Sequence, residues 1–147
     1  MDWFRVGETA ESMKAYNVIV TSLEENFTIL YGENTGRTLA KGAPMVLDAL
    51  GTFFGHNVTV RRKSGYESEF DDLYRLISRP RNNGLQFDIV HYQDTANYEG
   101  YVSSGARALK RIDEKSGKVY WDEFSMTIVP MRAQVTIDDG QSANQIW

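Results

Sequence analysis

The chain of 147 residues contains no cysteine and only two histidines. The lack of cysteine excludes disulfide bonds, thiolate nucleophiles and cysteine-ligated zinc, and it fits synthesis in a reducing compartment. His56 and His91 are too few and too far apart in the sequence to make a recognisable catalytic motif. We interpret both as structural residues, with His56 in a turn and His91 in a strand.

Long hydrophobic runs are also missing. No apolar stretch approaches the roughly 20 residues that a membrane-spanning helix needs. The first residues, Met1–Arg5, lack the basic and apolar regions of a signal peptide. We therefore expect no membrane partner.

Positive charge is not in excess either, because 16 lysine and arginine residues stand against 20 acidic ones, which gives a net charge of −4. The only basic triplet, Arg61–Lys63, is followed directly by an acidic stretch that contains Glu67, Glu69, Asp71 and Asp72. A nucleic-acid-binding surface needs clustered lysine and arginine, so the composition argues against one. The triplet is interpreted as a solvated strand end.

The remaining polar motifs do not assemble into chemistry. Asp71 and Asp72 are adjacent on a predicted helix, where their side chains diverge by roughly 100° and cannot share a proton. Asp138–Gly140 lacks the other ligands of a calcium loop. The glycines between positions 32 and 42 do not match a phosphate-binding loop. We predict a protein that is not an enzyme and that uses no cofactor and no metal.

What the chain does contain is an ordinary globular composition, with 41% hydrophobic and 24% charged residues, and a good supply of aromatics at 12%. This length and composition predict a single domain over residues 1–147, with a polar tail at 138–147. Alternation of apolar and polar residues predicts a series of strands. They are Asp2–Val6, Ala15–Ser22, Asn26–Tyr31, Asn57–Lys63, Leu85–Tyr92, Tyr98–Ser103, Ala108–Asp113 and Lys118–Val129, with Met131–Ile137 as a possible addition.

Three details of this pattern can be tested. Met45–Phe54 fits a helix or a buried strand, and the strand is favoured. Asp94–Asn97 is expected to be a turn. A hairpin is expected across Lys115–Gly117, and Asp122–Glu123 is expected to form a bulge in its second strand, because the apolar alternation changes register there.

One helix is predicted over Tyr66–Ser78. Apolar residues recur there at intervals of three and four, which places one apolar stripe against the sheet. Ser64 is the expected N-cap, with Glu67 three residues later as its partner in a capping box. Pro80 ends the helix.

The segment from Gly32 to Gly42 is rich in glycine and poor in apolar residues, which argues against regular structure. It is long for a connection within a domain, so it is either a flexible surface loop or an arm, at about residues 32–44, that binds another subunit. The terminal Trp147 is either a docking anchor or a frayed end. The interface residues predicted on this basis are Gly32, Asn34, Gly36, Arg37, Leu39, Lys41, Gly42 and Trp147.

The order of strand, helix and strands resembles the tail-tube fold of long-tailed bacteriophages. The residues that carry the resemblance lie between Val18 and Val135. They are Gly36-Arg37-Thr38, then Asn57–Pro80, Leu85–Gln93, Tyr98–Ile112 and Val119–Pro130. Outside this range, the opening Trp3–Gly7 also resembles small phage tail proteins. The resemblance implies a β-sandwich or barrel flanked by one helix.

The resemblance also implies a virion structural protein of the tail, made in the cytoplasm of a bacterial host. Subunits of that family join edge to edge into hexameric rings that form or cap the tail tube, and tube, distal tail and baseplate hub proteins share the fold. The partners implied are other copies of the chain and other tail proteins. DNA would pass through the lumen without sequence-specific binding. The alternative is a monomeric β-rich module that binds a ligand or protein, with Trp121 or Tyr101 in its pocket.

Overall fold

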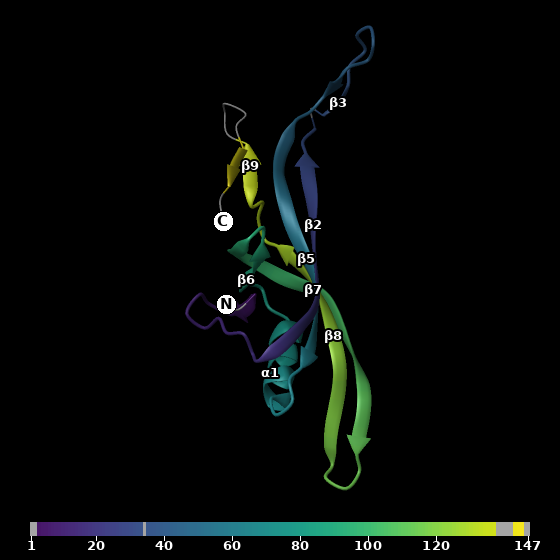
Figure 1. Ribbon diagram of the computed structural model, residues 1–147. Helices are drawn as coiled ribbons and strands as arrows, with labels where there is room; N and C mark the ends of the chain where they lie inside the picture. The colour runs from purple at the N-terminus through teal and green to yellow at the C-terminus, as the bar shows by residue number, and fades with distance from the viewer. Residues whose placement is uncertain (1–2, 34, 138–142, 146–147) are drawn as a thin grey trace.

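The computed structural model describes residues 3–33, 35–137 and 143–145, and these residues form strands and one helix (Figure 1). The helix, α1, spans Glu67–Ser78. The strands are β1 (Phe4–Gly7), β2 (Val18–Tyr31), β3 (Gly36–Arg37), β4 (Met45–Val46), β5 (Ala49–Arg62), β6 (Leu85–His91), β7 (Asp94–Asp113), β8 (Lys118–Pro130), β9 (Val135–Ile137) and β10 (Ala143–Gln145). The fold is therefore mainly β with one helix, as the sequence predicts.

Eight strands belong to one antiparallel sheet in the order β1-β6-β7-β8-β5-β9-β10, and β2 pairs with β5 beside this path. The central strand is β5, which pairs with β2 along its whole length and with β8 and β9 over shorter stretches. The short strands β3 and β4 form a separate two-stranded sheet. The chain is thus organised around long antiparallel hairpins.

The core follows from the two-residue period of the strands, because alternate side chains point to the same face. In β6, Leu85, Phe87, Ile89 and His91 are buried while the residues between them are half-exposed. Residues of β1, β5, β6, β7 and β8 share this core with one face of α1. Its members are Phe4, Val6, Val58, Val60, Phe70, Leu73, Ile77, Leu85, Phe87, Ile89, Tyr98, Phe124, Met126 and Ile128.

Helix α1 closes the core through Phe70, Leu73 and Ile77, which are the buried residues on its apolar stripe. The ring of Phe70 lies 4.8 Å from that of Phe124 in β8, measured between centroids. Burying each of these side chains contributes about 1.5–3 kcal/mol relative to exposure. Most of the stability of this short helix therefore comes from packing on the sheet.

The predicted bounds of α1 are right to within one residue, but its predicted N-cap is wrong. The N-cap is Tyr66 rather than Ser64, and no side chain caps it. Ser64 and Gly65 instead form a turn that is closed by a hydrogen bond from the Tyr66 amide to the Lys63 carbonyl, at 2.9 Å. Gly65 has a φ of +87° in this turn, so a glycine conformation precedes the helix and displaces the capping box.

Two long strands replace four predicted segments in the first half of the chain. β2 runs without interruption through Glu24 and Glu25, between the two predicted strands, and β5 joins most of the Met45–Phe54 segment to the next predicted strand. Gly51 and Gly55 lie within β5 at places where other segments of the same chain approach too closely for a Cβ atom. A Cβ atom at Gly55 would lie 2.9 Å from Asn26 Oδ1 and 3.1 Å from the Ile128 carbonyl oxygen.

A similar merger occurs in the second half. The predicted turn at Asp94–Asn97 is part of β7, and the chain reverses at Tyr92, which has a φ of 53°. The expected turn at Lys115–Gly117 is present, closed by a hydrogen bond of 2.7 Å from the Gly117 amide to the Asp113 carbonyl.

The predicted bulge at Asp122–Glu123 is also present. Arg107 in β7 pairs with Phe124, and Leu109 pairs with Trp121, so two steps along β7 match three along β8. The extra residue of β8 explains why the apolar alternation of this strand changes register.

Candidate functional site

Two hairpins extend from the body of the molecule in opposite directions (Figure 1). The hairpin of β2 and β5 carries the small sheet of β3 and β4 at its tip, and we call this whole tip, residues 27–50, the apolar tip. The hairpin of β7 and β8 extends past the end of β6, with its turn at residues 114–117. Both hairpins place side chains away from the core.

The apolar tip holds half of the large hydrophobic side chains that are exposed among the described residues. Phe27 is 66% exposed and Leu39 is fully exposed. The set comprises Phe27, Ile29, Leu30, Tyr31, Leu39, Met45, Val46, Leu47 and Leu50. Such a concentration of exposed large apolar side chains in one part of a molecule is typical of protein–protein contacts.

The predicted interface residues of this region do lie at the apolar tip. Gly36 and Arg37 form β3, while Leu39, Lys41 and Gly42 lie in the turn between β3 and β4. Asn34 and Trp147 lie outside the described residues. The expectation of no regular structure holds for most described residues of Gly32–Gly42. The exception is Gly36–Arg37, which pairs with β4, and next to it the Thr38 amide donates to the Pro44 carbonyl at 2.9 Å.

Sequence reasoning missed most of the apolar side chains at this tip. The sequence predicts the flanking strands, but the prediction does not place their apolar residues at an interface. The signal that could have identified them is that Ile29, Leu30 and Tyr31 follow one another, so both faces of β2 are apolar there. A strand with one face on a core does not need this pattern.

The β7–β8 hairpin is held to the helix by Arg107. Its guanidinium lies 4.1 Å from the ring centroids of both Tyr74 in α1 and Trp121 in β8. The same group donates to Asp71 at 2.9 Å. Asp71 therefore has an ion-pair partner in addition to its place in the helix, and Arg107 fixes the base of the hairpin.

A polar cluster occupies the end of the core where the β2–β5 hairpin leaves the body. One oxygen of Glu25, in β2, lies 2.5 Å from His91 Nδ1 and 3.6 Å from His56 Nε2. The other nitrogen of the His56 ring hydrogen-bonds to the Tyr98 hydroxyl at 2.8 Å. The turn position predicted for His56 is wrong, since it is buried in the middle of β5.

Burial dominates the electrostatics of this cluster. It lowers the pKa of His56 to about 4, an effect reinforced by His91 and opposed by Glu25. It also raises the pKa of the Tyr98 hydroxyl, as does the charge of Glu25. His56 is therefore neutral near pH 7, and the cluster fastens β2 and β5 to β6.

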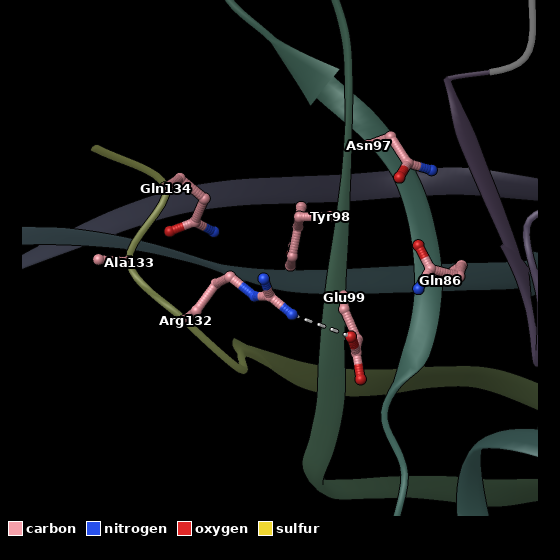
Figure 2. A pocket seen from close by; sticks show the side chains of 7 residues that line it. All are labelled: Gln86, Asn97, Tyr98, Glu99, Arg132, Ala133 and Gln134. Carbon is pink, nitrogen blue, oxygen red and sulfur yellow. Dashed lines mark ion pairs between the residues drawn. The ribbon is translucent and has the colours of Figure 1, made fainter. Parts of the chain in front are cut away.

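A small hollow of about 220 Å³ lies between β6, β7 and the segment before β9 (Figure 2). Glu99 and Arg132 form an ion pair of 3.6 Å at one side of it. The side-chain amide of Gln134 accepts a hydrogen bond from the Phe54 backbone N–H at 2.9 Å and donates one to the Phe54 carbonyl at 3.1 Å. Gln134 thus extends the sheet ladder where β9 has not yet begun, which is a structural role.

The described residues contain no group of three or more histidine and acidic residues that could hold a metal. Within the same part of the chain, no helix has the length and apolar character needed to cross a membrane. The candidate sites are therefore the surfaces of the two hairpins and the polar cluster around Glu25.

The sequence matches no protein-family model and no curated protein. The structure is similar to a chain in the tail of an empty gene transfer agent (GTA) particle, determined by helical refinement with C6 symmetry. The TM-score is 0.58 at 9% identity, over 89% of this chain and 91% of that one. A chain in the virion of the native GTA particle gives a TM-score of 0.55 at 8% identity, over 89% and 92%. At such low identity the likeness concerns the fold, and the chain has a phage-like tail-tube fold.

Proposed function

We propose that this protein is a structural subunit of a phage-like tail, and that its copies assemble into rings that form or cap a tail tube. The six-fold symmetry of the similar GTA tail supports rings of six. In this proposal the chain acts as one domain, has no catalytic role and needs no cofactor. It would be made in the cytoplasm of a bacterial host and function in the virion.

The apolar tip is the observation that carries the proposal. Nine large hydrophobic side chains are exposed there. Covering them with a partner would contribute about 25 cal/mol for each Å² of apolar surface that is buried. The tip also projects from the body, so it can reach a neighbour without moving the core (Figure 1). A second copy of the chain, in the same or the next ring, is the partner that the fold supports.

The opposite directions of the two hairpins support a stacked assembly. A contact between two different surfaces can repeat without limit or close into a ring, whereas two identical surfaces make only a dimer. The apolar tip of one copy would meet a different part of the next copy. Other tail proteins would bind at the ends of the stack, and DNA would pass through the lumen without sequence-specific contacts.

The test removes the outer part of the apolar tip, with Leu39, Met45, Val46 and Leu47, without opening the hairpin. The Gly32 amide donates to the Asp48 carbonyl at 2.7 Å, which marks a place where the two strands can be joined. Residues 33–47 are replaced by Asn-Gly, a sequence suited to a two-residue hairpin turn. We expect a folded monomer by circular dichroism and light scattering, whereas the full chain forms rings in electron micrographs.

A matched control keeps the tip and changes its charge instead, with Lys41→Ser. This control should still assemble if apolar burial drives the contact. Rings of unchanged size from the chain without its tip would show that the tip is not the interface.

The alternative function, a monomeric β-rich binding module, is favoured by one observation, the hollow beside Trp121. A full chain that stays monomeric at high concentration would support it.

A further inference from the structure

A second hollow, of about 420 Å³, lies where the β7–β8 hairpin meets the end of β5. Four cationic residues line it: Arg61 and Arg62 from β5, Lys63 from the following turn, and Lys110 from β7. The only acidic side chain in its lining is that of Asp122. This local excess of positive charge stands out in a chain whose net charge is −4.

The back wall of this basic hollow is rigid. Arg62 Nε donates to the Trp121 carbonyl at 3.2 Å, and Arg62 Nη1 lies 3.5 Å from Glu67 Oε1. The guanidinium also lies 4.8 Å from the centroid of the Tyr120 ring. Arg62 is thus held in place and its charge is largely balanced by Glu67.

The other three cations are not balanced in this way. Within the described residues, Arg61, Lys63 and Lys110 form no ion pair within 4.0 Å, although the Lys63 ammonium lies 5.7 Å from the Tyr66 ring centroid. Like charges that face one hollow repel each other, and an anion between them would remove that cost. Guanidinium and ammonium groups together are the donors that bind phosphate oxygens best.

The hollow is larger than a phosphate ion needs, and its other lining residues include Ile19 and Trp121. An apolar wall beside a cationic one fits a phosphate attached to a flat or apolar group. We propose that the basic hollow binds the phosphate of a phosphate ester, with Arg61, Lys63 and Lys110 as the groups that contact the phosphate. The site does not depend on the assembly proposed above.

The experiment is calorimetry on the full chain at constant ionic strength, with inorganic phosphate, a nucleoside monophosphate and the matching nucleoside. We expect the monophosphate to bind more tightly than inorganic phosphate, and the nucleoside not to bind. A short single-stranded oligonucleotide, compared at equal phosphate concentration, separates the two sources. Tighter binding per phosphate would assign the site to a nucleic-acid backbone, and equal binding to a free ester.

The double variant Arg61→Gln with Lys110→Gln should weaken binding of the monophosphate by about tenfold or more, since each lost contact is charge-assisted. The control Arg75→Gln with Lys115→Gln removes the same charge elsewhere on the surface, and it should bind as the unmodified chain does. Both variants change exposed residues, so circular dichroism should show the same fold. Equal loss in both variants, binding of the nucleoside alone, or binding of polyglutamate but of no phosphate compound would overturn the proposal.

Discussion

Glu25 Oε1 lies 2.5 Å from His91 Nδ1, which joins β2 to β6 across the end of the core. The two strands are not neighbours in the sheet, because β2 pairs only with β5. This contact therefore connects the base of the hairpin that carries the apolar tip to β6, which is separated from β5 in the sheet by β7 and β8. It is the feature from which the first two predictions follow.

Replacing Glu25 with glutamine should destabilise the fold by about 1–2 kcal/mol, because a charged hydrogen bond to His91 becomes a neutral one. The measurement is the free energy of unfolding in urea. Glu24→Gln is the control, since the Glu24 carboxylate is exposed and accepts only a long hydrogen bond of 3.4 Å from Asn57. Equal effects of the two substitutions would show that the Glu25 contact contributes nothing specific.

Stability should fall as the pH drops from 6.5 towards 4. Burial lowers the pKa of His56 to about 4 in the folded chain, while the unfolded chain has the ordinary value of 6.5. The unfolded state therefore takes up the proton first, and acid favours it by up to roughly 3 kcal/mol over this window. Urea unfolding between about pH 7 and pH 5 measures the slope before most carboxylates titrate, and His56→Gln should flatten it. A slope that His56→Gln leaves unchanged would contradict the assignment.

Arg107→Ala should cost about 1–3 kcal/mol of stability, since it removes two cation–π contacts and the ion pair with Asp71. Arg75→Ala is the comparison, because Arg75 makes an exposed ion pair with Asp72 within the same helix. That change should cost less than about 0.5 kcal/mol. Thermal unfolding of the two variants decides, and similar melting temperatures would mean that Arg107 does not hold the β7–β8 hairpin to α1.

Gln134→Leu should remove two hydrogen bonds to the backbone of Phe54. Gln134 is 2% exposed, and its side chain bonds both the Phe54 amide and the Phe54 carbonyl. Losing the Gln134 hydrogen bonds at this buried position should cost about 1–3 kcal/mol. Hydrogen exchange gives a local readout: the Phe54 amide should exchange much faster in Gln134→Leu. Gln134→Glu keeps the acceptor and should retain most of the protection. Unchanged exchange in the leucine variant would argue against the role assigned to Gln134.

Local patterns predicted the helix, the Lys115–Gly117 turn and the bulge at Asp122–Glu123, since each depends on residues close together in the sequence. The lengths of the strands could not be predicted in the same way. Gly51 in β5 looks like a strand breaker, yet a Cβ atom there would lie 2.7 Å from the Ala133 Cβ. Its glycine reflects a contact with a distant segment, which only the three-dimensional structure reveals.

The candidate sites show the same limit. The sequence indicated the region of the apolar tip but not its apolar side chains, because an exposed apolar strand and a buried one have the same types of residue. His56 and His91 look isolated in the sequence, and Glu25 brings them together only through the pairing of β2 with β5. Arg61–Lys63 lies at the end of β5 with Arg61 and Lys63 exposed, as the sequence predicts, but the sequence does not reveal that Lys110 and Trp121 lie beside it.

The central claim, assembly of the chain into rings, is tested most directly by imaging the purified full chain at high concentration. Electron microscopy with mass photometry would give both the symmetry and the mass of the particles. The proposal predicts rings with six-fold symmetry, alone or stacked into tubes. A uniform population of monomers at that concentration would contradict it.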